Sequence, residues 1–189
     1  KDLTDEVIGL FATLPSLMPA LHLPVQSGSN RILSAMNRRY TREHYLGLIE
    51  KLRRARPDIA LSTDIIVGFP GETEENFMDT YRLVEEVGYS QVFTFIYSKR
   101  EGTPAAEMDD DTPREVIQER FDRLVDLVQR KAFEANQAEL GATVPVLVEG
   151  TSKRDDSILA GKSPKNQTVH APVPAGADAT SLVGRIVPV

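Results

Sequence analysis

The sequence contains no cysteine and no tryptophan, and its three histidines are His22, His44 and His170. Without cysteine, these 189 residues can form no disulfide and no thiolate-ligated zinc or iron–sulfur site, and they offer no thiolate nucleophile. The histidines lie far apart and do not have the spacing of metal ligands. We therefore predict no metal site, and we interpret the histidines as ordinary surface or core residues.

Long apolar runs are missing as well. No stretch of eighteen apolar residues is present, so we expect no membrane-spanning helix. The first residues show no basic segment followed by an apolar one, so no signal peptide is predicted, and the expected location is the cytoplasm. The net charge of −6 is not typical of a general nucleic-acid-binding protein. Acidic residues gather in 101–115 and basic ones in 153–165, so any RNA contact is expected in the C-terminal segment.

Residues 20–140 alternate between strand-like and helix-like patterns. Short apolar runs predict strands at 20–25, 59–67 and 92–97, and the 59–67 run is typical of a strand buried on both faces. Amphipathic spacing predicts helices over 41–55 and 74–87, and a longer one that ends before Gly141. This alternation indicates an α/β fold with a parallel sheet. Polar residues follow each predicted strand, at the sheet edge where such folds bind ligands.

The pattern changes after Gly141. Short strands are predicted at 143–150, 157–160, 168–171 and 183–189, with glycine, proline, asparagine and aspartate between them. Several short strands within about fifty residues are typical of a small, OB-like β-barrel. We therefore expect two domains, residues 1–139 and residues 140–189.

Polar groups at the predicted strand ends suggest a ligand site. The turn 68–73 lies between a strand and a helix, where backbone N–H groups favour an anion, but it lacks a Walker lysine and a GxGxxG pattern. A tight turn is the simpler interpretation. Gln26, Arg38 and Asp64 supply an amide, a guanidinium and a carboxylate, which suits a ligand with both an amine and a carboxylate, such as an amino acid. Taken singly, each is an ordinary loop or cap residue.

Five segments carry a resemblance to a known family. Residues 22–29 read HLPVQSGS, 36–41 read MNRRYT, 63–73 read TDIIVGFPGET, and 95–106 read FIYSKREGTPAA. Together they resemble the second half of the radical S-adenosylmethionine (SAM) domain of the tRNA methylthiotransferases of the MiaB family. Residues 146–154, VLVEGTSKR, resemble the TRAM domain of that family. The resemblance implies the C-terminal half of a partial (β/α) radical SAM barrel followed by an all-β TRAM barrel whose last strand is cut.

The resemblance also implies cofactors and roles for individual residues. Complete members bind SAM and two 4Fe–4S clusters, one of them through a CxxxCxxC loop, and this cysteine-free chain can hold neither cluster. It is therefore expected to be inactive alone, and no catalytic residue is assigned. The residues expected at SAM are Gln26, Ser27, Arg38, Asp64, Ile66, Tyr97 and Ser98. Those expected at tRNA are Lys153, Arg154, Lys162, Lys165, Asn166 and Arg185.

The implied reaction adds a methylthio group at carbon 2 of isopentenyl-adenosine beside the tRNA anticodon. Three alternatives stay open. In the first, the target is threonylcarbamoyl-adenosine or a ribosomal protein, as in related enzymes. In the second, the chain is a stand-alone RNA-binding module. In the third, it is an α/β enzyme with its own small-molecule site. The last alternative needs a base or nucleophile near Glu72 or Asp64, and none is evident. We also expect a second copy of the chain to cover exposed strand edges, giving a homo-oligomer.

Overall fold

A parallel three-stranded sheet forms the centre of the N-terminal part of the chain. The computed structural model describes residues 3–137 and 139–189. The strands are β1 (Ala20–His22), β2 (Ala60–Val67) and β3 (Gln91–Ile96), in the order β1-β2-β3. The helices before β3 are α1 (Asp5–Thr13), α2 (Asn30–Ala35), α3 (Arg42–Ala55) and α4 (Glu74–Val87). The predicted α/β alternation and parallel pairing are therefore confirmed.

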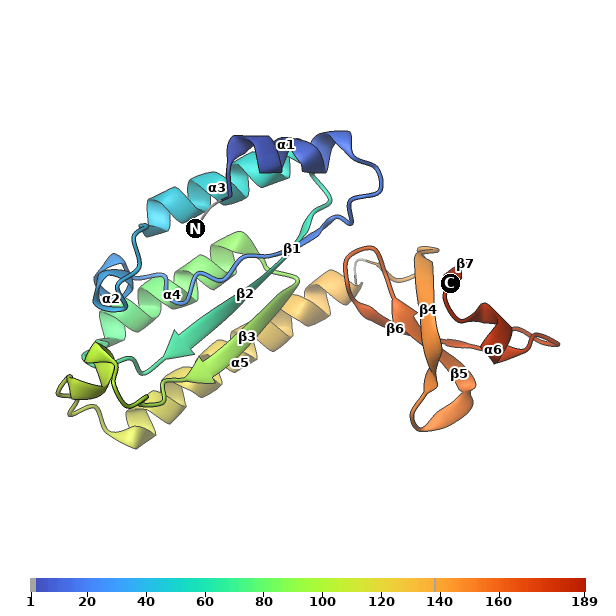
Figure 1. Cartoon of the computed structure of the whole chain (residues 1–189). Coiled ribbons are helices and arrows are strands. Elements are labelled where there is room, and N and C mark those ends of the chain that lie inside the picture. Colours follow the sequence, from blue (N-terminus) through green and yellow to red (C-terminus); the bar gives the residue numbers. More distant parts are fainter. Residues whose placement is uncertain (1–2, 138) are drawn as a thin grey trace.

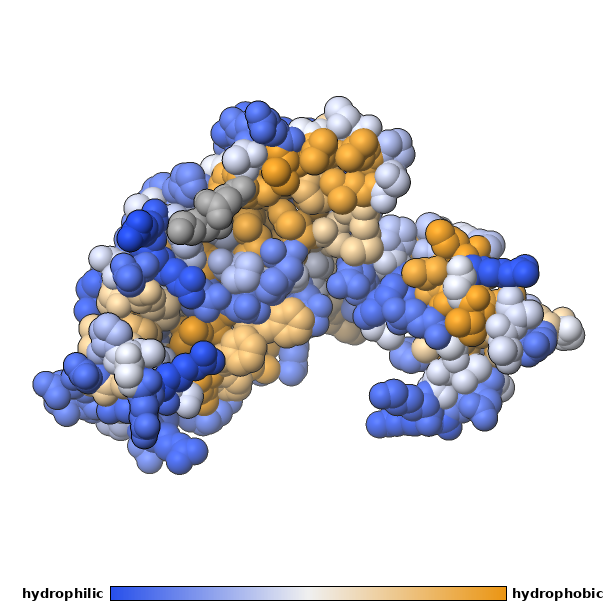
Figure 2. Space-filling model, viewed as in Figure 1, coloured by the Kyte–Doolittle hydropathy of each residue, from blue (hydrophilic) through white to orange (hydrophobic). Residues whose placement is uncertain are grey.

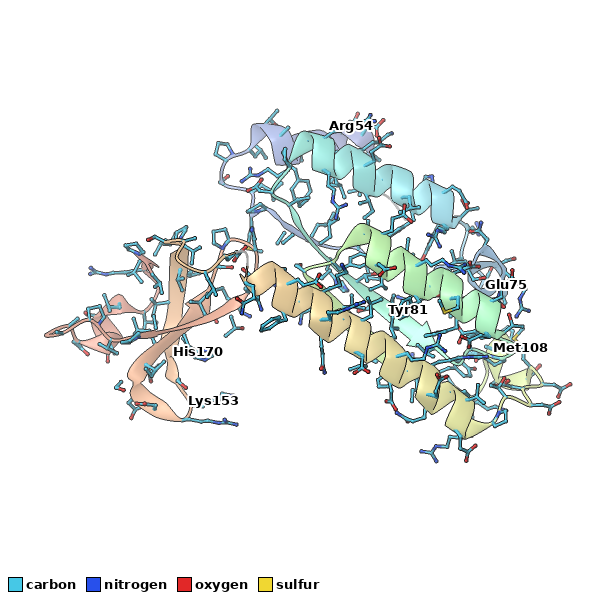
Figure 3. All side chains as sticks on the ribbon, turned by 180° about the vertical axis from the view of Figure 1, so that it is seen from behind. Arg54, Glu75, Tyr81, Met108, Lys153 and His170 are labelled. Atoms are coloured by element: carbon cyan, nitrogen blue, oxygen red, sulfur yellow. The ribbon has the colours of Figure 1, made fainter. Side chains whose placement is uncertain are left out.

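Helices cover one face of this sheet and leave the other open. Figures 1 and 3 show α3, α4 and α5 (Arg114–Gln137) behind the strands when the open face is in front. Thr63, Ile65 and Val67 of β2 are buried, and the two apolar ones pack with Phe77 of α4. The residues between them on β2 are half-buried. The prediction that residues 59–67 are buried on both faces is therefore wrong, because none of the helices in the described ranges packs on the second face.

The predicted strand at 20–25 is also shorter and more exposed than expected. Only residues 20–22 pair with β2 as a ladder, and β1 forms the edge of the sheet. The chain then continues beside β2 through isolated hydrogen bonds, such as the one from the Leu23 N–H to the Ser62 carbonyl oxygen at 2.8 Å. Pro24 has no N–H to donate, which interrupts a regular ladder.

Helix α5 connects this sheet to a second one. It packs against β3 and α4 and buries Arg120, Leu124 and Leu127. A short 3-10 helix, η1 (Pro104–Glu107), precedes it and was not predicted. No described helix is long and apolar enough to cross a membrane.

The C-terminal part is a curled antiparallel sheet. Its strands are β4 (Pro145–Ser152), β5 (Asp155–Lys162), β6 (Thr168–Pro172) and β7 (Ile186–Pro188), in the order β6-β5-β4-β7. A one-turn helix, α6 (Ala179–Leu182), precedes β7. Val146, Val148, Leu159 and Ala171 form its buried side. The curl agrees with the predicted small barrel, and the boundary predicted at 139–140 falls between α5 and β4.

Two side-chain contacts join the second sheet to the end of α5. Lys165 forms an ion pair with Glu139, and the Gln167 Nε2 donates to Asn136 Oδ1 at 3.3 Å. Both Lys165 and Gln167 belong to the β5–β6 connection, which lies beside the last turn of α5 (Figure 1). These polar contacts tie the β5–β6 connection to the last turn of α5, through Asn136, and to the segment just after it, through Glu139.

Candidate functional site

A cavity of about 630 Å³ lies on the open face, at the carboxyl ends of β2 and β3. Six of the seven residues predicted to contact SAM line it: Gln26, Arg38, Asp64, Ile66, Tyr97 and Ser98. This is the sheet edge at which parallel α/β folds bind ligands. The structure therefore brings together residues that are up to 72 positions apart in the sequence.

The backbone at Gln26 has a strained conformation that brings it to β2. Its φ is 71°, in the left-handed region, which a residue other than glycine seldom adopts. The Gln26 N–H donates to the Asp64 carbonyl oxygen, and the Gln26 carbonyl accepts from the Ile66 N–H, both at 2.9 Å. Such strain persists only where the surroundings impose it, and it is concentrated at functional sites. Here it fixes Gln26 beside Asp64 at the cavity.

Asp64 and Ile66 point to the cavity because alternate residues of a strand share a face. The Asp64 side chain keeps 29% of its surface exposed, and its Oδ1 lies 3.4 Å from Nε2 of His22. The other ring nitrogen of His22 lies 2.9 Å from the Ser62 hydroxyl. The interpretation of His22 as an ordinary residue missed this contact, since its two partners lie 40 and 42 positions further along the chain.

Two arginines stand at the cavity with Asp64. Arg38 follows α2, where its N–H donates to the Leu33 carbonyl oxygen at 2.8 Å, and Arg100 follows β3. Both side chains are exposed at the rim. Arg100 was not predicted from the sequence. One carboxylate and two guanidinium groups around one cavity complement a zwitterion that carries both an ammonium and a carboxylate group.

An apolar wall completes the cavity. It contains Ile66, Phe69, Phe95 and Tyr97, and the rings of Phe69 and Tyr97 meet edge to face with centroids 5.2 Å apart. Figure 2 shows apolar side chains over β3 on this face, where Phe95 is 51% exposed. The Tyr97 hydroxyl is buried and has no hydrogen-bond partner within the described part of the chain. A flat, apolar group of a ligand fits such a wall.

Ser27 lies away from the cavity. It is fully buried, its Oγ is 3.2 Å from the Thr80 hydroxyl, and it accepts from the Ser29 N–H. A Cβ on the next residue, Gly28, would lie 2.5 Å from the Asp79 carbonyl oxygen, so only glycine permits this close approach to α4. Ser27 and Gly28 therefore anchor the segment that carries Gln26, and Ser27 does not face the ligand space.

The side chain of Glu72 folds back onto the turn 68–73, to which it belongs. Glu72 is buried, and its Oε2 accepts from the Gly68 N–H at 2.8 Å. Burial raises the pKa of Glu72 from its ordinary value of 4.5 to about 7. Among residues 68–73, Phe69 alone lines the cavity. The structure thus agrees with a tight turn, and it does not support an anion site there.

The residues predicted to contact tRNA fall at two ends of the second sheet. Lys153 and Arg154 form the exposed β4–β5 turn, and Figure 3 shows Lys153 extending away from it. Lys165 and Asn166 lie in the β5–β6 connection, about 23 Å away along β5. The remaining two, Lys162 and Arg185, are nearer to this second end, because both flank the β4 residues 147–148. The ion pair with Glu139 engages Lys165.

Comparisons with known proteins show what this chain is similar to. Residues 2–84 match the radical SAM superfamily. The structure also resembles coproporphyrinogen III oxidase from Escherichia coli, a radical SAM enzyme, with a TM-score of 0.58 over 87% of this chain and 45% of that one. At 14% identity, this likeness shows the radical SAM fold alone.

Curated relatives match nearly the whole chain. A tRNA-2-methylthio-N(6)-dimethylallyladenosine synthase from Oceanobacillus iheyensis is 50% identical over 189 residues, which are 100% of this chain and 36% of the relative. Synthases of the same name from Acetivibrio thermocellus and Streptomyces viridosporus are 50% and 52% identical, over 99% and 90% of this chain and 38% and 34% of their own lengths. The chain thus spans about a third of the length of the curated relatives it matches.

Proposed function

We propose that this chain forms one wall of the SAM pocket and the tRNA-binding domain of a radical SAM tRNA methylthiotransferase. The observation that carries the proposal is the cavity at the ends of β2 and β3. It gathers six of the seven residues expected at SAM, in a chain about 50% identical to the dimethylallyladenosine synthases. A stand-alone RNA-binding module would have no need of such a cavity.

The residues at the cavity fit SAM. Arg38 would hold the carboxylate of its methionine part, and Asp64 would accept hydrogen bonds from its ammonium group or ribose hydroxyls. Ile66 and the Tyr97 ring would flank the adenine. When bound, SAM supplies the radical that abstracts hydrogen from the substrate. The chain's own residues bind and orient the cofactor and keep water from the apolar wall.

The residues present do not fit an iron–sulfur cluster. The chain has no cysteine, and among the residues described no group of three histidine, aspartate or glutamate side chains could hold a metal ion. Cluster ligands would therefore come from residues beyond these 189, and we propose that the chain is inactive without them. The two 4Fe–4S clusters belong to the proposed complete enzyme.

The proposed substrate is N6-dimethylallyl (isopentenyl) adenosine next to the tRNA anticodon, which receives a methylthio group at carbon 2. The name printed for the relatives supports this target. We propose that residues 140–189 form a TRAM domain that binds tRNA through phosphate contacts. The exposed Lys153–Arg154 turn and Arg185 are its main candidates. A tRNA substrate also supports a cytoplasmic location.

Calorimetry with S-adenosylhomocysteine tests the pocket. The Arg38→Gln variant changes a residue that lines the cavity. We expect it to bind S-adenosylhomocysteine about tenfold more weakly or worse, since a charge-assisted contact is lost. The matched control is Arg39→Gln, because Arg39 does not line the cavity and this variant should bind as the wild type does. Equal affinities for all three proteins would refute the assignment of the cavity.

A second assay tests the reaction. The complete gene product, loaded with its clusters, is given radiolabelled SAM and tRNA that carries dimethylallyladenosine. Transfer of the labelled methyl group to this base is the expected result. Binding of S-adenosylhomocysteine without any transfer would leave the SAM pocket standing and overturn the choice of substrate.

A further inference from the structure

His22 has two polar contacts on the open face of the sheet. Its Nδ1 lies 2.9 Å from the Ser62 hydroxyl, and its Nε2 lies 3.4 Å from Asp64 Oδ1. The side chain is 45% exposed, so it is no core residue. His22 does not line the cavity, whereas Asp64 does. Any influence of His22 on a ligand therefore passes through Asp64.

The contact follows from strand register. His22 pairs with Ser62 in the β1–β2 ladder, and Asp64 pairs with Phe93 in the β2–β3 ladder. Ser62 and Asp64 share a face because they are two residues apart. The edge-to-face contact of the His22 and Phe93 rings, with centroids 5.9 Å apart, adds a third strand to the arrangement. Three strands thus hold the imidazole above β2 in one place.

The Ser62 contact is compatible with either tautomer of the imidazole, and one of the two places a proton on the nitrogen that faces Asp64. When the Ser62 hydroxyl donates to Nδ1, the proton is on Nε2, which can donate to Asp64 Oδ1. This contact engages one carboxylate oxygen and restricts rotation of the side chain. The contact leaves Oδ2 of Asp64, a residue that lines the cavity, without a contact to His22.

We propose that His22 is a positioning residue, which holds the Asp64 carboxylate in the orientation that accepts hydrogen bonds from bound SAM. The inference rests on the proposed function, since it assumes that the cavity takes SAM. Ser62 supports it by fixing the imidazole, and Phe93 supports it by packing against the ring edge. The ligand class is an adenosyl amino acid with donor groups that reach Asp64.

A double-mutant cycle separates this role from a structural one. In the 189-residue chain, His22→Phe keeps a ring against Phe93 and removes the donor to Asp64. We expect its Kd for S-adenosylhomocysteine to rise about three- to tenfold, the range of one hydrogen bond. In an Asp64→Asn background the same change should alter Kd less than twofold, because the two residues act as a unit.

Conservative variants add a readout that folding alone would not move. His22→Gln places an amide near the Nε2 position and should retain most of the affinity, whereas the shorter His22→Asn can reach Ser62 and should bind like His22→Phe. Thermal unfolding of every variant shows whether the fold is kept. Because the Gln and Asn variants are both polar, this pair decides the question even where His22→Phe fails to fold.

The outcomes distinguish the inference from the proposed function. A wild-type chain that binds no S-adenosylhomocysteine overturns both. Binding by the wild type that is unchanged in all three His22 variants overturns the positioning role alone. An equal loss from His22→Phe with and without Asp64→Asn also overturns it, since the effect would then not pass through Asp64.

Discussion

Arg120 donates a hydrogen bond from Nη1 to the carbonyl oxygen of Glu72 at 2.8 Å. Its Nε also donates to Glu74 Oε2 at 3.0 Å, and Arg120 itself is only 6% exposed. One side chain of α5 therefore holds both the end of the turn 68–73 and the first residue of α4. Since Phe69 of this turn lines the cavity, α5 supports the cavity wall from behind.

Arg120→Met should destabilise the fold. It leaves a buried carbonyl oxygen without its donor, so we expect the free energy of unfolding to fall by about 2–3 kcal/mol. Urea denaturation measures it. The control is Arg130→Met, because Arg130 faces Glu85 at 4.0 Å in an exposed pair and should change stability by less than about 0.5 kcal/mol. Similar losses for both variants would contradict a structural role for Arg120.

Glu72 makes stability depend on pH. Burial raises its pKa to about 7, so between pH 4.5 and 7 the folded protein holds this proton more tightly than the unfolded chain does. The free energy of unfolding should therefore decrease as pH rises through this window. Glu72→Gln should remove that decrease and be more stable than wild type at pH 8 by about 2–3 kcal/mol. Denaturation at pH 5.5 and 8 tests this, with the exposed Glu75→Gln as the control.

Gly28→Ala should lower the free energy of unfolding by several kcal/mol, because the new Cβ would lie 2.5 Å from the Asp79 carbonyl oxygen and 2.6 Å from the Thr80 Cα. Neither backbone atom can move without shifting α4. Gly47→Ala in α3 is the matched control: its Cβ would meet nothing within 4 Å, and it should stabilise the helix by about 0.5–1 kcal/mol. A stable, folded Gly28→Ala protein would show that the close approach is not required.

Much of the fold could be predicted because local signals marked its boundaries. Thr41 accepts from the His44 N–H, and Thr73 forms a reciprocal capping box with Asn76, so the helices start within one residue of the prediction. The helices α1 and α2 were not predicted, and neither were the four-residue elements η1 and α6, which are too short to show helical periodicity. Burial of the 59–67 strand was misjudged, because composition does not show which face the helices cover.

The site was predicted in part, and the rest depends on contacts distant in sequence. Family resemblance pointed to Gln26, Arg38 and Asp64, and the structure brings all three to one cavity. It did not point to Arg100 or His22. The role of His22 depends on a strand register that no local pattern contains. In the same way, Lys165 looks like any exposed lysine until the structure places it against Glu139.

Replacing the buried hydroxyl of Tyr97 is expected to stabilise the fold, whereas most substitutions destabilise it. It has no hydrogen-bond partner in the described ranges, so Tyr97→Phe removes an unsatisfied polar group and keeps the ring contact with Phe69. We expect the free energy of unfolding to rise by about 1 kcal/mol. The affinity for S-adenosylhomocysteine should stay the same if the ring acts by packing. A loss of affinity would show that the hydroxyl contacts the ligand.

The two ends of the second sheet should contribute differently to tRNA binding. The double variant Lys153→Gln/Arg154→Gln changes both basic residues of the exposed turn and should bind tRNA more weakly. The slope of log K against log salt concentration should become smaller in magnitude by about 1–2, as expected when two phosphate contacts are lost. Lys165→Gln should leave the salt slope unchanged, because Lys165 is paired with Glu139. Filter binding at several salt concentrations measures both. A larger change in slope for Lys165→Gln would mean that Lys165 leaves Glu139 to bind RNA, and that the contact between the β5–β6 connection and the segment after α5 opens on binding.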